Sequence, residues 1–258
     1  MSNYSGRRNG GYNKEDAQDI IYGVRAVIEA VKDQRPINKI FIQKGINKEL
    51  FYELKDALAD KKYNLQFVPQ QKLNKFTRKN HQGVVAQISP VPYQKIEPIV
   101  EKIYEEGDIP MILLLDGLTD VRNFGAIART AECHGVNAIV IPNKDSVSIT
   151  SDAIKTSAGA LGRIPVCQTH DISAVIHYLK EFGIQMVAAT EKAQKTTTQI
   201  DFTLPTAIVM GSEDKGVSNK ILGLCEEKCK IPMTGTIASL NVSVAAGILM
   251  YEALRQRL

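Results

Sequence analysis

Hydrophobic positions along the chain follow two patterns that alternate from one end to the other. Short apolar runs, such as MILLLD at 111–116 and TAIVMG at 206–211, predict buried strands. Between such runs, apolar residues recur at helical spacing, as in ISAVIHYLKEFG at 172–183. Runs this apolar, with little polar alternation, are typical of a parallel sheet covered by helices on both faces. The chain is therefore predicted to have an α/β fold.

The second half of the chain carries most of this pattern. Strands are expected at residues 111–116, 138–142, 163–169, 184–190, 206–211 and 228–233. Helices are expected at residues 124–135, 151–161, 172–183, 218–226 and 241–258. Strands that alternate with helices in this way predict βαβ units.

A smaller α/β domain is predicted before it. Helices are expected at 19–31 and 47–61, the second with Asn47 as its cap, and strands at 37–43, 64–69 and 83–89. The domain organisation follows as a basic tail at 1–17, a small α/β domain at 18–92, a proline- and acid-rich linker at 93–108 and a large domain at 109–258.

Charge is divided unevenly between the two halves of the chain. The net charge of +4 conceals +8 in residues 1–95 and −4 in residues 96–258, which indicates a separate anion-binding half. No apolar run reaches the roughly 18 residues that a membrane span needs. No apolar stretch follows the arginines of the N-terminus, so a secretory signal is not expected and the cytoplasm is the predicted location. Cys225 and Cys229 lack a second ligand pair, so we expect reduced buried thiols and no metal.

Three polar segments follow expected strands and carry the candidate chemistry. The first contains Asn123 and Arg129, the second contains Glu213, and the third contains Ser239 and Asn241. Taken singly, each has an ordinary interpretation as a helix cap, a solvated charge or a polar turn. Ligands of open α/β sheets, however, bind beyond the carboxyl ends of strands, which is where these segments lie. The glycine-rich fingerprints of dinucleotide sites and P-loops are absent.

Taken together, in this order and spacing, the segments resemble the three motifs of the SpoU (TrmH-like) family of RNA ribose methyltransferases. The similar sequences are NFGAIARTA at 123–131, VMGSEDKG at 209–216 and IPMTGTIASLNVS at 231–243. HQGVVA at 81–86 and IYGVRAVIEAV at 21–31 resemble the RNA-binding domain of that family. The resemblance covers nearly all of the chain beyond residue 18. Within the family it is strongest to the bacterial enzymes that methylate a guanosine of large-subunit ribosomal RNA.

The resemblance implies a fold and an activity. The expected fold is a parallel sheet with helices on both faces and a deep C-terminal trefoil knot (SPOUT), preceded by the RNA-binding domain. The expected reaction moves a methyl group from S-adenosylmethionine to a ribose 2′-hydroxyl. The family is homodimeric, and the implied partner is large-subunit ribosomal RNA.

 No metal is expected to take part in the reaction.

The resemblance also implies roles for individual residues. The implied active-site residues are Asn123, Arg129, Glu213, Ser239 and Asn241. The implied cofactor-binding residues are Gly211, Ile231, Met233 and Leu240. Because a guanidinium stays protonated in proteins, we expect Arg129 to bind a phosphate and stabilise the developing alkoxide rather than to act as the base. Glu213 or a water is the expected proton acceptor.

The RNA reader is expected in residues 61–83, where cations gather without an acid among them. The candidate RNA-binding residues are Lys61, Lys62, Lys72, Lys75, Arg78, Lys79 and His81. Phe76, Tyr63 and His81 are candidates for stacking on unpaired bases. Three alternatives stay open: a transfer RNA substrate, a non-catalytic RNA-binding or ribosome-assembly protein, and a small-molecule α/β enzyme. The intact motifs argue against lost catalysis, and the basic first domain argues against a small-molecule enzyme.

Overall fold

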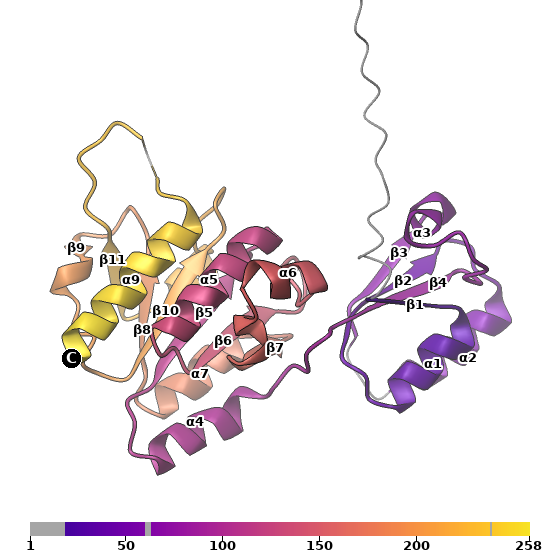
Figure 1. The fold of residues 1–258 in the computed structure, drawn as a ribbon, viewed down its shortest axis with the longest axis horizontal. Coiled ribbons are helices and arrows are strands. Elements are labelled where there is room, and N and C mark those ends of the chain that lie inside the picture. Colours follow the sequence, from indigo (N-terminus) through magenta and orange to yellow (C-terminus); the bar gives the residue numbers. More distant parts are fainter. Residues whose placement is uncertain (1–18, 60–62, 238) are drawn as a thin grey trace, which may run out of the picture. The chain divides into compact units, whose positions relative to one another are not determined.

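The computed structural model describes residues 19–59, 63–237 and 239–258, and the chain divides into two compact units (Figure 1). The first unit is Met1–Ile88 and the second is Ser89–Leu258. The tail expected at 1–17 and the candidate residues Lys61 and Lys62 lie outside the described residues.

The second unit is built on a parallel sheet. Its strands are β5 (Met111–Asp116), β6 (Ala138–Pro142), β7 (Val166–Thr169), β8 (Gln185–Ala189), β9 (Lys195–Thr196), β10 (Thr206–Gly211) and β11 (Glu227–Lys230). They lie in the order β7-β6-β5-β10-β8-β11-β9, and every pairing is parallel. The apolar runs in the sequence correspond to the central strands, so the predicted parallel sheet is confirmed. The two-residue strand β9 was not expected.

Helices cover both faces of this sheet. They are α4 (Ile96–Glu105), α5 (Val121–Cys133), α6 (Ser151–Thr156), α7 (Ile172–Glu181), α8 (Asn219–Leu222) and α9 (Val242–Arg257). Alternate residues of β5 face opposite cores: Leu113 belongs to a cluster with residues of α5 and α9, and Ile112 to a cluster with residues of α4, α7 and α8. Figure 1 shows α5 and α9 side by side on one face.

The segment expected as a linker, 93–108, belongs to the second unit. Residues 96–105 form α4, and Ile96, Val100 and Ile103 of this helix are buried in the core beneath the sheet. The division between the units therefore falls at Ile88 and Ser89, before the proline-rich stretch. This segment packs as a helix of the second unit because its three apolar residues recur at helical spacing. Their apolar surface is removed from water when the helix packs.

The first unit is a small mixed α/β domain. Its elements are β1 (Ile20–Tyr22), α1 (Val24–Lys32), β2 (Ile37–Gln43), α2 (Lys48–Leu58), β3 (Leu65–Val68), α3 (Gln70–Phe76) and β4 (Val84–Ile88). The strands lie in the order β1-β4-β2-β3; β2 and β3 are parallel, and β4 is antiparallel to β1 and β2. The helix expected at 19–31 begins at Val24, because residues 20–22 pair with β4 as a strand.

No helix in the described part of the chain is long and apolar enough to cross a membrane.

Candidate active site

The three polar segments meet at the carboxyl end of the central strands. Asp116 and Gly211, the last residues of β5 and β10, are partners in the register of these neighbouring strands. The segment after β5 leads into α5, and the segment after β10 forms a tight turn. The backbone N–H of Ser218, which follows this turn, donates to Asp116 Oδ2 at 2.8 Å. Segments separated by about 100 residues in sequence are thus joined at one edge of the sheet.

Asn123, Glu213 and Asn241 form one hydrogen-bonded cluster at this edge. Glu213 Oε1 accepts from Asn123 Nδ2 at 2.8 Å and from Asn241 Nδ2 at 2.7 Å. Asn241 Nδ2 also lies 3.1 Å from Asn123 Oδ1, to which it donates. We call these three residues the amide–carboxylate triad. Of the five predicted catalytic residues, the structure joins these three by direct hydrogen bonds.

The two asparagines reach the triad in different ways. Asn241 caps α9, since its Oδ1 accepts from the N–H groups of Ser243 and Val244, and its NH₂ group remains for Glu213. Asn123 does not cap α5. The cap is Asp120, whose Oδ1 accepts the N–H of Asn123 at 2.7 Å, so the whole side chain of Asn123 is available to the triad.

A tight turn presents Glu213. The N–H of Ser212 donates to Gly216 O at 3.2 Å, and the N–H of Gly216 donates to Ser212 O at 2.9 Å. A Cβ atom on Gly211 would lie 1.8 Å from the carbonyl carbon of Gly216, so only glycine fits at this close approach of two backbones. The resulting turn leaves Glu213 exposed at its tip.

Arg129 and Ser239 lie outside the triad. Arg129 is exposed on α5, two turns beyond Asn123, and its side chain makes no hydrogen bond or ion pair within the described residues. Ser239 is exposed in the segment before α9 and lines the cavity described next. Both residues are accessible to a ligand, but the structure does not bring them into contact with Glu213.

A cavity of about 400 Å³ opens beside the triad, beyond the ends of β8, β10 and β11. Its lining includes all four predicted cofactor-binding residues, Gly211, Ile231, Met233 and Leu240, together with Glu213. Met233 and Leu240 are 42 % and 38 % exposed, so the cavity offers apolar surface to a ligand. Its volume lies within the range of small-molecule sites.

Sequence reasoning missed part of the cavity wall. The cavity is also lined by Ala189 at the end of β8, by Thr190, Glu191 and Lys192 directly after it, and by Lys230 at the end of β11. The signal that could have found them is the position of β8, because strands that neighbour β10 must end at the same edge.

The cysteines offer neither a nucleophile nor a metal site at this edge. Cys229 lines the cavity, but burial, with a smaller contribution from Glu227, raises the pKa of its thiol to about 12, so it stays protonated. Burial likewise raises the pKa of Cys225 to about 11. Cys133, unlike Cys225 and Cys229, is exposed. The residues that the structure describes contain no group of three or more His, Cys, Asp or Glu side chains placed to hold a metal ion.

The predicted RNA-binding residues of the first unit divide into two groups. Lys72, Lys75, Arg78 and Lys79 are exposed. His81 is buried, and its two ring nitrogens contact Asn74 Oδ1 at 2.9 Å and the N–H of Gly83 at 3.0 Å. Its ring therefore cannot stack on a base.

The other two stacking candidates are also engaged in the fold. Phe76 packs against Phe41 with 4.7 Å between ring centroids, and Tyr63 packs against the core of the first unit. Burial of the Tyr63 ring raises its pKa. The prediction that these rings are free to stack is therefore not supported by their packing.

Comparison with known families agrees with this arrangement. Residues 110–251 match the SpoU rRNA methylase family, and residues 20–94 match the substrate-binding domain of RNA 2′-O-ribose methyltransferases. The first match contains all three polar segments and the triad. The chain is thus an RNA methyltransferase by family.

Relatives extend over nearly the whole chain. TrmH family tRNA/rRNA methyltransferases of Bacillus subtilis and Staphylococcus aureus are 35 % and 39 % identical over 239 residues, with 93 % and 92 % of this chain and 96 % of each relative covered. The chain belongs to the SpoU/TrmH family of RNA 2′-O-ribose methyltransferases. With the family comes the SPOUT fold, the parallel sheet with a C-terminal trefoil knot that the sequence motifs implied.

Solved structures show the same fold. The SpoU methyltransferase AviRb from Streptomyces viridochromogenes has a TM-score of 0.59 at 24 % identity, with 96 % of this chain and 93 % of that chain covered. An RNA 2′-O-ribose methyltransferase has a TM-score of 0.55 at 26 % identity, with 94 % and 91 % covered. The TrmH/SpoU tRNA modifying enzyme of A. aeolicus has a TM-score of 0.53 at 30 % identity, with 63 % of this chain and 84 % of that chain covered.

Proposed function

We propose that this enzyme transfers a methyl group from S-adenosylmethionine to the ribose 2′-hydroxyl of a guanosine in large-subunit ribosomal RNA. The observation that carries the proposal is the amide–carboxylate triad beside a cavity that contains every predicted cofactor-binding residue. Two amides orient the carboxylate through one of its oxygens, which leaves the other oxygen for a hydrogen bond from a hydroxyl, and the cavity is suited to a small donor molecule.

The cavity fits the proposed cofactor in size and in chemistry. Apolar side chains of Met233 and Leu240 can pack against an uncharged ring, and the small residues Gly211 and Ala189 leave backbone groups accessible. Three carboxylates line the wall and are balanced by three lysines, which suits a ligand that carries groups of both charges: Glu191, Glu213 and Asp214, and Lys192, Lys215 and Lys230. When bound, S-adenosylmethionine supplies an electrophilic methyl group on a positively charged sulfur.

Glu213 is proposed to manage the proton of the ribose hydroxyl. The hydroxyl oxygen forms a bond to the methyl carbon while the carbon–sulfur bond breaks, and the hydroxyl proton must leave the oxygen. Glu213 Oε1 is held by Asn123 and Asn241, which orients Oε2 for a hydrogen bond from the hydroxyl and for receipt of its proton. Arg129, exposed on the same helix as Asn123, is proposed to bind a neighbouring phosphate and to stabilise the developing negative oxygen.

Recognition of the RNA is proposed to lie in the first unit. Lys72, Lys75, Arg78 and Lys79 are exposed there, and residues 1–95 carry a net charge of +8. Phosphate contacts of this kind provide salt-dependent affinity. Because ribosomal RNA is the proposed substrate, the proposed location of the enzyme is the cytoplasm.

We further propose that the enzyme is a homodimer. Helix α9 exposes Val244, Ile248 and Tyr251, which recur at helical spacing on one face and are 51 %, 37 % and 58 % exposed. Burial of such a stripe against a second copy would remove apolar surface from water. The stripe begins three residues after Asn241, so an interface here would adjoin the active site.

Transfer of labelled methyl groups to defined RNA tests the proposed reaction. The purified chain is incubated with methyl-labelled S-adenosylmethionine and RNA from a strain that lacks the gene, and 2′-O-methylation is then mapped. We expect label at one guanosine of large-subunit ribosomal RNA, and loss of transfer by at least about 100-fold in Glu213→Gln. Glu181→Gln, which removes an exposed carboxylate from the end of α7, is the control.

The outcomes separate the alternatives. Label in transfer RNA alone would show that transfer RNA, and not ribosomal RNA, is the substrate. The names of the bacterial relatives include both kinds of RNA. RNA binding without transfer to any fraction would identify a non-catalytic RNA-binding protein. Equal rates for Glu213→Gln and the wild type would contradict the proposed role of Glu213.

A further inference from the structure

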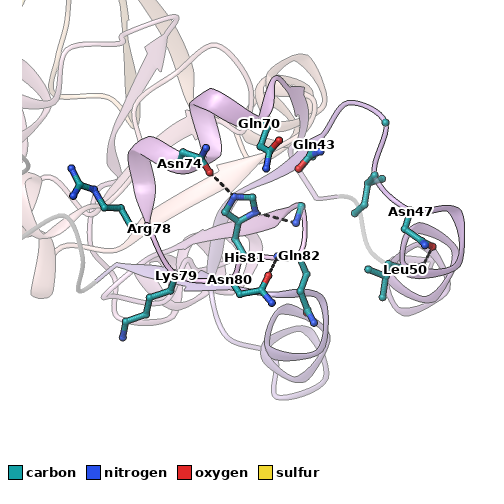
Figure 2. Close-up of a pocket in the computed structure, with 13 residues that line it drawn as sticks. Gln43, Asn47, Leu50, Gln70, Asn74, Arg78, Lys79, Asn80, His81 and Gln82 are labelled. Carbon is teal, nitrogen blue, oxygen red and sulfur yellow. Dashed lines mark hydrogen bonds between the residues drawn. The ribbon is translucent and has the colours of Figure 1, made fainter.

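The first unit contains a second cavity, separate from the active site. It has a volume of about 450 Å³ and lies between the end of β2, the start of α2, α3 and the loop before β4 (Figure 2). Among the described residues, no carboxylate lines it. Figure 2 shows His81 near its centre, Gln43 and Gln70 on one side, and Arg78 and Lys79 extending away from the ring.

Hydrogen bonds fix the wall of this cavity. His81 Nδ1 accepts the N–H of Gly83, so Nε2 carries the proton and donates to Asn74 Oδ1 at 2.9 Å. Gln82 adopts a left-handed backbone conformation with φ of 51°, and its N–H donates to Asn80 Oδ1 at 3.2 Å. The side chain of Gln82 also accepts the N–H of Val24, at the start of α1. The loop before β4 is therefore preorganised rather than a simple connection.

Three carboxamides of the wall are held so that they offer hydrogen-bond donors to a ligand. The side-chain oxygens of Asn47, Asn80 and Gln82 accept backbone N–H groups, which leaves their NH₂ groups for other partners. The carboxamides of Gln43 and Gln70 make no hydrogen bond among the described residues. Together with two cations at the rim, this wall is suited to a ligand rich in acceptor atoms.

We propose that this cavity holds one unpaired nucleotide of the RNA substrate. The keto oxygens of a uracil or guanine base would accept from the carboxamide NH₂ groups, and the adjoining phosphate would contact Arg78 and Lys79. The inference rests on the proposed function, because it assumes that the chain acts on RNA. It adds a base-reading role to a unit whose cations alone would bind any RNA sequence.

Short single-stranded RNA probes test the preference for a keto base. Fluorescein-labelled U8 and C8 differ at position 4 of the ring, where uracil has an accepting oxygen and cytosine has a donating NH₂ group. Fluorescence anisotropy with the full chain is expected to show about tenfold tighter binding of U8 than of C8. Equal affinities for the two probes would overturn the proposal.

A matched pair of variants assigns the preference to the cavity. Gln70→Leu removes a lining carboxamide from the exposed start of α3, and Gln71→Leu makes the same change at the exposed neighbouring position, which does not line the cavity. We expect the U8 preference to disappear in Gln70→Leu and to persist in Gln71→Leu. Loss of the U8 preference in both variants, or its persistence in both, would contradict the assignment to the cavity.

Two further measurements separate a nucleotide site from an anion site and from the proposed function. Uridine monophosphate is expected to displace U8 at concentrations at which inorganic phosphate does not. Equal displacement by the two competitors would show that the cavity binds only an anion, and would overturn the proposal. Gln70→Leu is expected to raise KM for RNA by about tenfold without a change in kcat. U8 preference in a wild-type chain that transfers no methyl group would refute the proposed function but support the cavity.

Discussion

Asn241 uses the two ends of its carboxamide for two different purposes. Its oxygen accepts backbone N–H groups at the start of α9, and its nitrogen donates to Glu213 and Asn123. One side chain thus fixes both a helix end and the carboxylate that we propose to be catalytic. A substitution that keeps the oxygen and removes the nitrogen can separate the two roles.

Asn241→Asp makes that separation. An aspartate still caps the helix, so thermal stability should be nearly unchanged, but it removes the NH₂ group and places a second carboxylate beside Glu213. We expect single-turnover methyl transfer to fall by at least about 100-fold. Asp171→Ala, which removes the side-chain cap of α7, is expected to lower the melting temperature without slowing transfer. A full transfer rate in Asn241→Asp would show that the triad is not needed.

Arg129→Lys tests the proposed role of the arginine. Lysine keeps the charge but lacks the planar guanidinium that binds a phosphate through two parallel hydrogen bonds. We expect a drop of about tenfold or more in the single-turnover rate across the pH range, measured with saturating cofactor. A wild-type rate in Arg129→Lys would rule out two-point binding of a phosphate.

The sequence identified these residues, but it did not determine how each is placed. Asn123 precedes an apolar run and looked like a helix cap, whereas Asp120, three residues earlier, performs that task. Both residue types are good caps, so local pattern alone could not choose between them. The hydrogen bond from Asn123 to Glu213 joins residues 90 positions apart, and such a contact follows from the sheet order rather than from local sequence.

At the scale of elements, the turn after β10 depends on the absence of a side chain at Gly211. In Gly211→Ala the added Cβ would meet the backbone of Gly216, so the turn must open and Glu213 must move. We expect a loss of stability of about 3 kcal/mol or more and loss of cofactor binding, measured by thermal unfolding and calorimetry. Gly162→Ala, where a Cβ would meet nothing within 4 Å, is the control. Unchanged cofactor affinity in Gly211→Ala would contradict this account.

Glu252, in the last turns of α9, is expected to make a pH-dependent contribution to stability. Hydrogen bonds from Arg255, and then from Gln256, lower the pKa of Glu252 from 4.5 to about 2. Because the folded-state pKa is lowered, the contribution is complete above pH 4.5 and is lost as the pH falls toward 2. The difference in melting temperature between the wild type and Glu252→Gln should therefore shrink from pH 7 to pH 3. A difference that stays constant over this range would contradict the prediction.

Elements with a strong local pattern were predicted well, and elements that depend on distant partners were not. The apolar runs at 111–116 and 206–211 became β5 and β10 with the expected bounds. Residues 20–22 continue an apparently helical pattern but form β1, because β4 supplies hydrogen-bonding partners more than 60 residues away. Gly23, with φ of 93°, then turns the chain into α1.

At the scale of the whole molecule, charge and chemistry are divided between the two units. The triad and its cavity lie within Ser89–Leu258, whereas the exposed cations and the donor-lined cavity lie within Met1–Ile88. The uneven charge was visible in the sequence, because net charge needs no knowledge of contacts. The second cavity was not, because its wall combines residues of β2, α2, α3 and the loop before β4.

The proposed dimer can be tested by a substitution in the exposed stripe on α9. Ile248→Lys places a charge in the middle of the exposed stripe on α9, and its burial against a second copy would cost free energy. Light scattering coupled to size-exclusion chromatography should show a dimeric wild type and a monomeric Ile248→Lys. Because the stripe adjoins Asn241, we expect the monomeric variant to lose methyl transfer while it remains folded, with a melting temperature lowered by the loss of the dimer contacts.

Ile109→Lys provides the matched control for this experiment. Ile109 is 48 % exposed but precedes β5, at the end of the sheet opposite the triad, so the variant should remain dimeric and active. A wild-type chain that is monomeric and fully active would refute the dimer. A monomeric Ile248→Lys with full activity would instead show that each copy holds a complete active site, because the neighbouring copy would then contribute nothing that the reaction requires.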